Sequence, residues 1–144
     1  SGLFSTALGF NTIANGDFTT SLGVQTVASG NVSIAIGENT TAKSAYETTL
    51  GRYNTAYTPN STSSWNSSDR LFSIGNGISN VNRSDAMVVL KNGNTGFGTS
   101  TPNTTLHIVG QMKYVDGNQA AGYIPVSDAN GAMTWTDPSF IASA

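Results

Sequence analysis

The sequence contains no cysteine, few charged residues and no long hydrophobic run. Without cysteine the chain can form no disulfide framework, no thiolate metal site and no cysteine nucleophile. Charged residues make up 10% of the 144 residues, and the net charge of −2 leaves no basic patch for nucleic acid. No stretch approaches the roughly 18 apolar residues of a membrane-spanning helix. We therefore expect no nucleic-acid partner, no membrane insertion and no cofactor.

Small polar residues take the place of the missing charges. Ser, Thr, Asn and Gly together make up nearly half of the chain. Leu, Ile, Val and Phe supply about a fifth, just above the range of disordered chains, and the low net charge also argues against disorder. The composition indicates an ordered, core-poor protein whose hydroxyl-rich and amide-rich surface suits the outside of a cell or particle.

A repeat of 14 residues runs through residues 5–55. Its columns are Gly9, Gly23, Gly37 and Gly51; Leu8, Leu22, Ile36 and Leu50; Thr12, Thr26 and Thr40; Ala14, Ala28 and Ala42; the bulky Phe18, Val32 and Tyr46; and a second glycine at Gly16 and Gly30, replaced by Ser44. Helical repeats need 30 or more residues per unit, so this interval excludes them. Two short alternating runs and two turns per repeat predict one coil of a flattened β-solenoid.

Stacked coils turn each column into a ladder along the solenoid, with a rise of about 4.8 Å per coil. The ladder of Leu8, Leu22, Ile36 and Leu50 is predicted to form the buried core, because it is the large apolar column present in every copy. The glycines are predicted to mark the corners, where they adopt unusual dihedral angles without steric cost. Because so small a coil buries little apolar area against its ordering entropy, we expect an obligate oligomer.

Residues 5–55 resemble the YadA-like head repeats of trimeric autotransporter adhesins. The shared pattern, A-[LI]-G-x-x-[TA]-x-A-x-[GS], occurs at Ala7-Leu8-Gly9 and Ala35-Ile36-Gly37, and at Ser21-Leu22-Gly23 with Ser in place of Ala. The resemblance implies a left-handed parallel β-roll in which three chains associate side by side. The implied partner is therefore the chain itself, as a homotrimer.

The sequence changes character after residue 55, and we divide it into 1–55, a Ser/Asn-rich linker or loop at 56–68, and a β domain at 69–144. Trp65, within the loop, is interpreted either as an exposed aromatic contact or as a side chain that docks on its own trimer. From residue 69 short strands alternate with turns such as Asp116-Gly117 and Asn130-Gly131, and no window shows helical periodicity. The whole chain is therefore predicted to be all-β.

Residues 69–137 are similar to segments of phage tail fibres and bacterial surface fibres. The stretch from Leu90 to Gly110 fits the fibre pattern LKNGNxGxGTxTPxxxLHVxG, with Phe97 and Ile108 as conservative departures. This similarity implies a small intertwined trimeric element of strands and hairpins.

No arrangement of residues indicates an active site. The single histidine, His107, has no second ligand or nucleophile near it in sequence, so a solvated or packed role is favoured over catalysis, although a threefold axis could gather three copies around an ion. The acidic residues lie beside turn residues, where Asx turns explain them. We predict no enzyme and no metal site.

The leading functional hypothesis is a trimeric adhesive fibre, extracellular, on a bacterial surface or phage-like particle. Multivalent display by three chains would compensate for weak single sites, and the target would be a glycan or protein of a host or prey cell surface. Exposed aromatic side chains suit sugar faces, which makes Trp65, Tyr114, Tyr123 and Trp135 the candidate ligand residues. Packing in the trimer core is the alternative for these aromatics. The alternative function is a structural shaft whose recognition domain lies elsewhere.

Overall fold

A computed structural model describes residues 2–140. Within that range every regular element is a β-strand except one turn of 3₁₀-helix at Pro138–Phe140. The chain forms two compact units, residues 1–110 and 111–144. No helix in the described part of the chain is long and apolar enough to span a membrane. The prediction of an all-β chain is confirmed.

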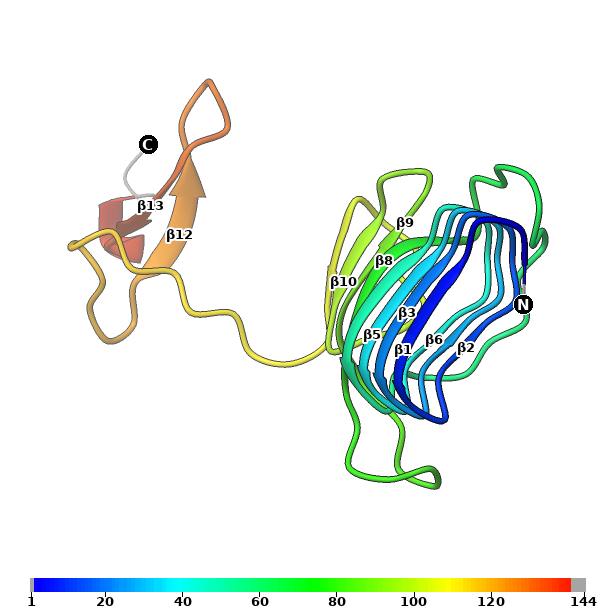
Figure 1. Cartoon of the computed structure of the whole chain (residues 1–144). Coiled ribbons are helices and arrows are strands. Elements are labelled where there is room, and N and C mark those ends of the chain that lie inside the picture. The colour runs from blue at the N-terminus through cyan, green and yellow to red at the C-terminus, as the bar shows by residue number, and fades with distance from the viewer. Residues whose placement is uncertain (1, 141–144) are drawn as a thin grey trace. The chain divides into compact units, whose positions relative to one another are not determined.

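The first unit begins with a parallel β-solenoid (Figure 1). Four long strands lie in one sheet: β1 (Thr6–Phe10), β3 (Thr20–Val24), β5 (Ile34–Glu38) and β7 (Thr48–Arg52). A second, narrower sheet holds β2 (Ile13–Ala14), β4 (Val27–Ala28) and β6 (Thr41–Ala42). Each long strand pairs with the next in a register of 14 residues, so that Leu8, Leu22, Ile36 and Leu50 form one column. The predicted solenoid of 14-residue coils is confirmed.

The interior of the coils is lined by small side chains rather than by leucine. Ala28, Ala35 and Ala42 are fully buried and form the apolar cluster. The hydroxyls of Ser21 and Thr26, also fully buried, lie 2.7 Å apart and satisfy each other across the coil. Burial without a partner would cost each hydroxyl free energy, so this pairing allows a polar interior.

The structure corrects the placement of the leucine ladder. Leu8 is 68% exposed and Ile36 36%, and Leu22 and Leu50 are half-buried. Strand side chains alternate between the two faces, and the preceding column, which contains Ala35, points inward. A coil this narrow accepts Ala, Ser and Thr, so the large apolar residues lie on its outer face.

The glycines serve close packing more than corners. Gly37 lies inside β5 with φ of +126°, and a Cβ there would lie 1.9 Å from the carbonyl oxygen of Gly51. At Gly30 a Cβ would lie 2.0 Å from the carbonyl oxygen of Ser44. The corners themselves are built by non-glycine residues with positive φ, such as Asn11 and Phe18. The predicted assignment of glycines to corners is thus replaced by one of close backbone approach between coils.

A fifth strand extends the long sheet beyond the recognised repeats. β8 (Arg70–Asn76) pairs in parallel with β7, which places Ile74 beside Leu50 and Gly75 beside Gly51. The chain then reverses through the antiparallel β9 (Asp85–Leu90) and β10 (Thr95–Phe97) and ends the sheet with β11 (Leu106–Ile108). Residues 69–110 therefore continue the sheet of the repeats, a continuity that the predicted division at residue 69 does not include.

The second unit contains one hairpin. β12 (Ile124–Ser127) pairs antiparallel with β13 (Met133–Thr136). Oδ1 of Asp128 accepts hydrogen bonds from the backbone N–H groups of Asn130 and Ala132, and Gly131 has φ of +83°. The turn predicted at Asn130-Gly131 is the turn of this hairpin.

Candidate functional site

The outer face of the long sheet carries a continuous apolar stripe. We call it the apolar ladder, and its members are Leu8, Leu22, Ile36, Leu50 and Ile74. The parallel register places these side chains one above another at the strand spacing of about 4.8 Å. The chain itself leaves them half-buried or exposed. A contiguous exposed apolar surface of this kind marks an interaction site.

The segment of residues 56–68 is tied to the solenoid by hydrogen bonds. The carboxylate of Asp69 accepts the backbone N–H groups of Asn60 and Ser61 at 2.7 and 2.9 Å. The carbonyl oxygen of Thr62 accepts the N–H of Asn31 at 2.7 Å. The segment is thus an ordered loop against the last coils.

Trp65 lies in this loop and is 55% exposed. Its ring centroid lies 6.1 Å from that of Tyr46, and Nζ of Lys91 lies 5.5 Å from its ring. Burial lowers the pKa of Lys91 against the opposing charges of Asp69 and Glu47. One face of Trp65 is therefore occupied within its own chain, while about half of the side chain is open to a partner.

Beneath the loop a polar network closes the end of the solenoid. Arg70 and Asp85 form a buried ion pair at 3.3 Å, and Arg70 also donates to the carbonyl and hydroxyl oxygens of Thr55 at 3.0 and 2.6 Å. The hydroxyl of Tyr57 donates to the buried Glu47 at 2.8 Å. Burial, together with the negative charge of Glu47, raises the pKa of Tyr57. Because each charge has partners, the network is structural.

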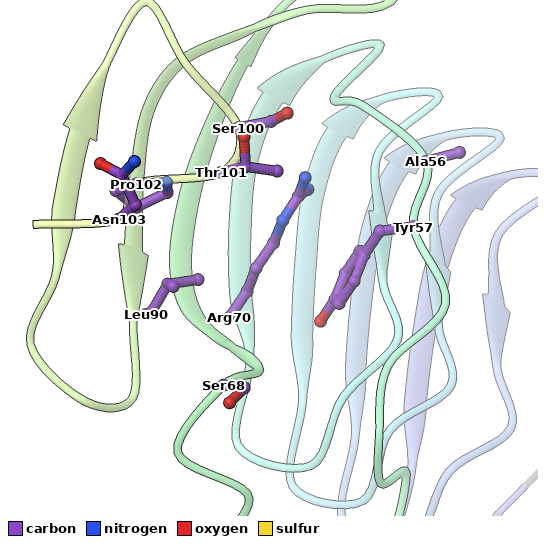
Figure 2. A pocket seen from close by; sticks show the side chains of 9 residues that line it. All are labelled: Ala56, Tyr57, Ser68, Arg70, Leu90, Ser100, Thr101, Pro102 and Asn103. Atoms are coloured by element: carbon purple, nitrogen blue, oxygen red, sulfur yellow. The ribbon is translucent and has the colours of Figure 1, made fainter. Parts of the chain in front are cut away.

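A cavity of about 460 Å³ lies beside this network (Figure 2). Its walls are formed by Ala56, Tyr57, Ser68, Arg70, Leu90, Ser100, Thr101, Pro102 and Asn103. Figure 2 shows the side chains of Arg70 and Tyr57 side by side, and the guanidinium lies 4.3 Å from the ring centroid. Since Asp85 and Thr55 already occupy Arg70, the cavity presents mainly apolar groups and hydroxyls, without a catalytic arrangement.

In the second unit Tyr114 and Trp135 line one cavity of about 590 Å³. Nε1 of Trp135 donates to the carbonyl oxygen of Tyr114 at 2.8 Å, and the Tyr114 hydroxyl donates to the carbonyl oxygen of Met133. The two rings lie 6.3 Å apart. Gln111, Lys113 and Gln119 add amide and ammonium groups to the walls. These are the elements of a small carbohydrate site, namely ring faces with polar groups around them.

The four aromatic residues that the sequence singled out do not form one site. Tyr114 and Trp135 come together as described, and Tyr123 is half-buried just before β12. Trp65 belongs to the first unit. The apolar ladder was recognised from its 14-residue spacing but was assigned to the interior, and the spacing alone contains no signal for which face it lies on.

His107 is half-buried on β11, and its Nδ1 has no hydrogen-bond partner among the described residues. Within residues 2–140 no group of three or more His, Cys, Asp or Glu side chains lies close enough to hold a metal ion.

Comparison with known proteins gives one match. Residues 1–26 and 14–40 each match the family model of the YadA head domain repeat. The search of curated proteins and the search of solved structures gave no match for the chain. The YadA-like character of the repeats is thereby confirmed over residues 1–40, and the resemblance of residues 69–137 to phage and bacterial fibres stays a prediction.

Proposed function

We propose that this chain is a segment of a trimeric, extracellular adhesive fibre, on a bacterial surface or phage-like particle, that presents repeated binding sites to a target cell. The exposed apolar ladder is the observation that carries the proposal. Five large apolar side chains lie in register on the outside of a coil whose own interior accepts only small ones. Association of chains would remove this surface from water, and the YadA-like repeats support an assembly of three.

The mass of the protein in solution tests this proposal. Light scattering after size exclusion should give three times the chain mass of 14.9 kDa, and the value should persist on dilution. A folded monomer at every concentration would overturn the trimer. The variant Leu22→Asn should lower the mass, whereas Val27→Asn, on the narrower sheet, should leave it unchanged.

For the binding site we propose the cavity of Tyr114 and Trp135, with a cell-surface glycan as its ligand. Two aromatic rings, two side-chain amides and Lys113 line the cavity, and three copies per fibre would raise a weak affinity through avidity. A glycan array probed with the intact protein and with Trp135→Ala measures this directly. Signals lost in the variant support the site, and equal signals for both proteins would contradict it.

A structural shaft is the second candidate function. It is favoured by the first unit, where the charged groups of the buried network are paired within the chain. The shaft predicts a trimer that binds no glycan on the array, so the mass and the array together separate the two functions.

A further inference from the structure

The corner that precedes each long strand carries a bulky side chain on a left-handed backbone. The φ angle is +53° at Phe4, +58° at Phe18, +60° at Val32 and +63° at Tyr46. Positive φ costs free energy for residues with a Cβ, and it is least suited to a β-branched residue such as valine. We call these four residues the corner ridge.

The opposite corner of the same coils is an internal control. Seven residues further on, Asn11, Gln25 and Asn39 have nearly the same φ, at +51°, +53° and +53°. Asparagine is among the residues that tolerate this conformation best, because its short side chain can hydrogen-bond locally. Backbone geometry alone would therefore favour asparagine at the corner ridge too. The bulky side chains must contribute something that outweighs the backbone cost.

Within one chain the corner ridge finds little to pack against. Phe4 is 83% exposed and Phe18 59%, and their rings stack mainly on each other, with centroids 5.4 Å apart. Val32 and Tyr46 are exposed as well. Trp65 approaches Tyr46 and lengthens the ridge. An exposed apolar row of this length marks a contact with another molecule.

The position of the ridge identifies that molecule as a second copy of the chain. The ridge flanks the beginning of each long strand, and the end of each long strand carries Phe10, Val24, Glu38 and Arg52, which we call the edge column. In a ring of three parallel chains each interface is heterologous, so the beginning of one sheet faces the end of the next. The ridge of one copy then faces the edge column of its neighbour.

The two columns also match in spacing and chemistry. Both repeat once per coil, so one residue of the ridge faces one residue of the edge column at each level. Phe10 and Val24, at the levels of Phe4 and Phe18, are exposed and apolar. At the level of Tyr46 the edge column offers Arg52, a partner for an aromatic ring.

From this match we propose that the corner ridge is the seam of the trimer: it packs against the edge column of the neighbouring copy while the apolar ladders meet at the threefold axis. The inference rests on the proposed trimer and assigns the contacts between its chains.

Engineered cysteines test the seam, since the chain has none of its own. In the double variant Phe18→Cys/Val24→Cys the two sites lie at opposite ends of β3, about 20 Å apart at 3.3 Å per residue. A disulfide requires Cα atoms within about 7 Å, so only neighbouring chains can link. Mild oxidation should give a covalent trimer on a non-reducing gel that reverts to monomers on reduction. Phe10→Cys and Glu38→Cys in place of Val24→Cys cover a shift of one level.

Three controls accompany the double variant. Phe18→Cys alone and Val24→Cys alone should stay monomeric on the gel, and so should Phe18→Cys/Val27→Cys, in which the second site lies on the narrower sheet. Light scattering of the reduced proteins reports the assembly separately. A reduced protein that is monomeric, like the unmodified chain, contradicts the trimer itself. A reduced trimer in which no edge-column cysteine forms the ring overturns the seam, and so does a dimer from Phe18→Cys alone.

The variant Val32→Asn supplies a test without cysteines. Asparagine suits the backbone better but removes apolar contact, so the coil should form at least as well while the trimer dissociates at a concentration about tenfold higher. Circular dichroism checks the fold, and dilution in light scattering measures dissociation. An unchanged dissociation concentration would mean that the ridge contacts no neighbouring chain.

Discussion

At the scale of single residues, the distance between neighbouring backbones decides which side chains the solenoid tolerates. Positions that face the adjacent coil have no room for a Cβ, as at Gly37 beneath Gly51. Positions that point into the coil accept Ala, Ser and Thr, and Leu and Ile remain outside. The low charge and high Ser, Thr and Gly content of the sequence are therefore consequences of coil width.

Replacing Gly37 by alanine should destabilise the solenoid severely. The added methyl group would meet the carbonyl oxygen of Gly51 at 1.9 Å, and backbone on both sides prevents a local adjustment. We expect a loss of about 4 kcal/mol in the free energy of unfolding or failure to fold. Gly93→Ala is the matched control, because it also has positive φ but nothing within 4 Å, and it should lose about 1–2 kcal/mol. Urea unfolding of both variants measures the difference, and equal losses would contradict the close-approach explanation.

At the scale of elements, the sheets of the solenoid end differently. The long sheet continues into β8, whereas the narrow sheet ends at β6 against a side chain. Oδ1 of Asn54 accepts the N–H of Thr41 at 2.8 Å, and its Nδ2 donates to the carbonyl oxygen of Thr41 at 3.0 Å. The amide of Asn54 thus takes the place of the backbone of a further strand, which satisfies groups that an open edge would leave unpaired.

Substitution of Asn54 by alanine should remove this cap. Two buried hydrogen bonds are lost and both backbone groups of Thr41 remain without partners, so we expect the free energy of unfolding to fall by about 2 kcal/mol. Asn103→Ala, at an exposed position, should change it by less than about 0.5 kcal/mol. Thermal or urea unfolding compares the two, and a neutral Asn54→Ala would show that water replaces the amide.

The hairpin of the second unit should respond to acid. Backbone N–H groups, first that of Asn118 and then that of Trp135, hold the pKa of Asp116 below its ordinary value of 3.8. A carboxyl whose pKa is lower in the folded state stabilises that state above the unfolded pKa, and the contribution is lost as pH falls through the folded pKa. Amide NMR signals of Trp135 should therefore change as the pH falls below 3.8. In Asp116→Asn, which keeps an acceptor oxygen but does not titrate, this change should be absent, and its persistence would assign it to another group.

The sequence predicted elements where one pattern had one structural solution. The interval of 14 residues implied coils, and the YadA-like pattern implied parallel strands, which the structure has. The interval could not indicate which face of a coil is inside, because alternating Ala and Leu are compatible with either until coil width is known. It also missed β8, since the longer interval between Gly51 and Gly75 hides a repeat that pairing in space restores. The separation of Trp65 from Tyr114 and Trp135 depended on long-range folding, which no local motif contains.

At the scale of the whole molecule, stability and assembly draw on the same apolar surface. Each coil buries small side chains, and the larger apolar residues of the ladder and corner ridge remain on its outside. Apolar burial between chains would then supply what the coil interior lacks. The exposed ion pair of Glu38 and Arg52 contributes little, because water and salt screen it.

This division of roles predicts that the assembly withstands salt. Raising the sodium chloride concentration to about 1 M shortens the Debye length to about 3 Å and weakens contacts between exposed charges, but it leaves apolar contacts intact. Light scattering should give the same mass at low and at high salt, also for the variant Glu38→Gln, in which the ion pair is broken. Leu22→Asn should reduce the mass at both concentrations. A trimer that dissociates in salt would place the chain contacts on the charged residues of the edge column, and the apolar ladder would then need a different partner.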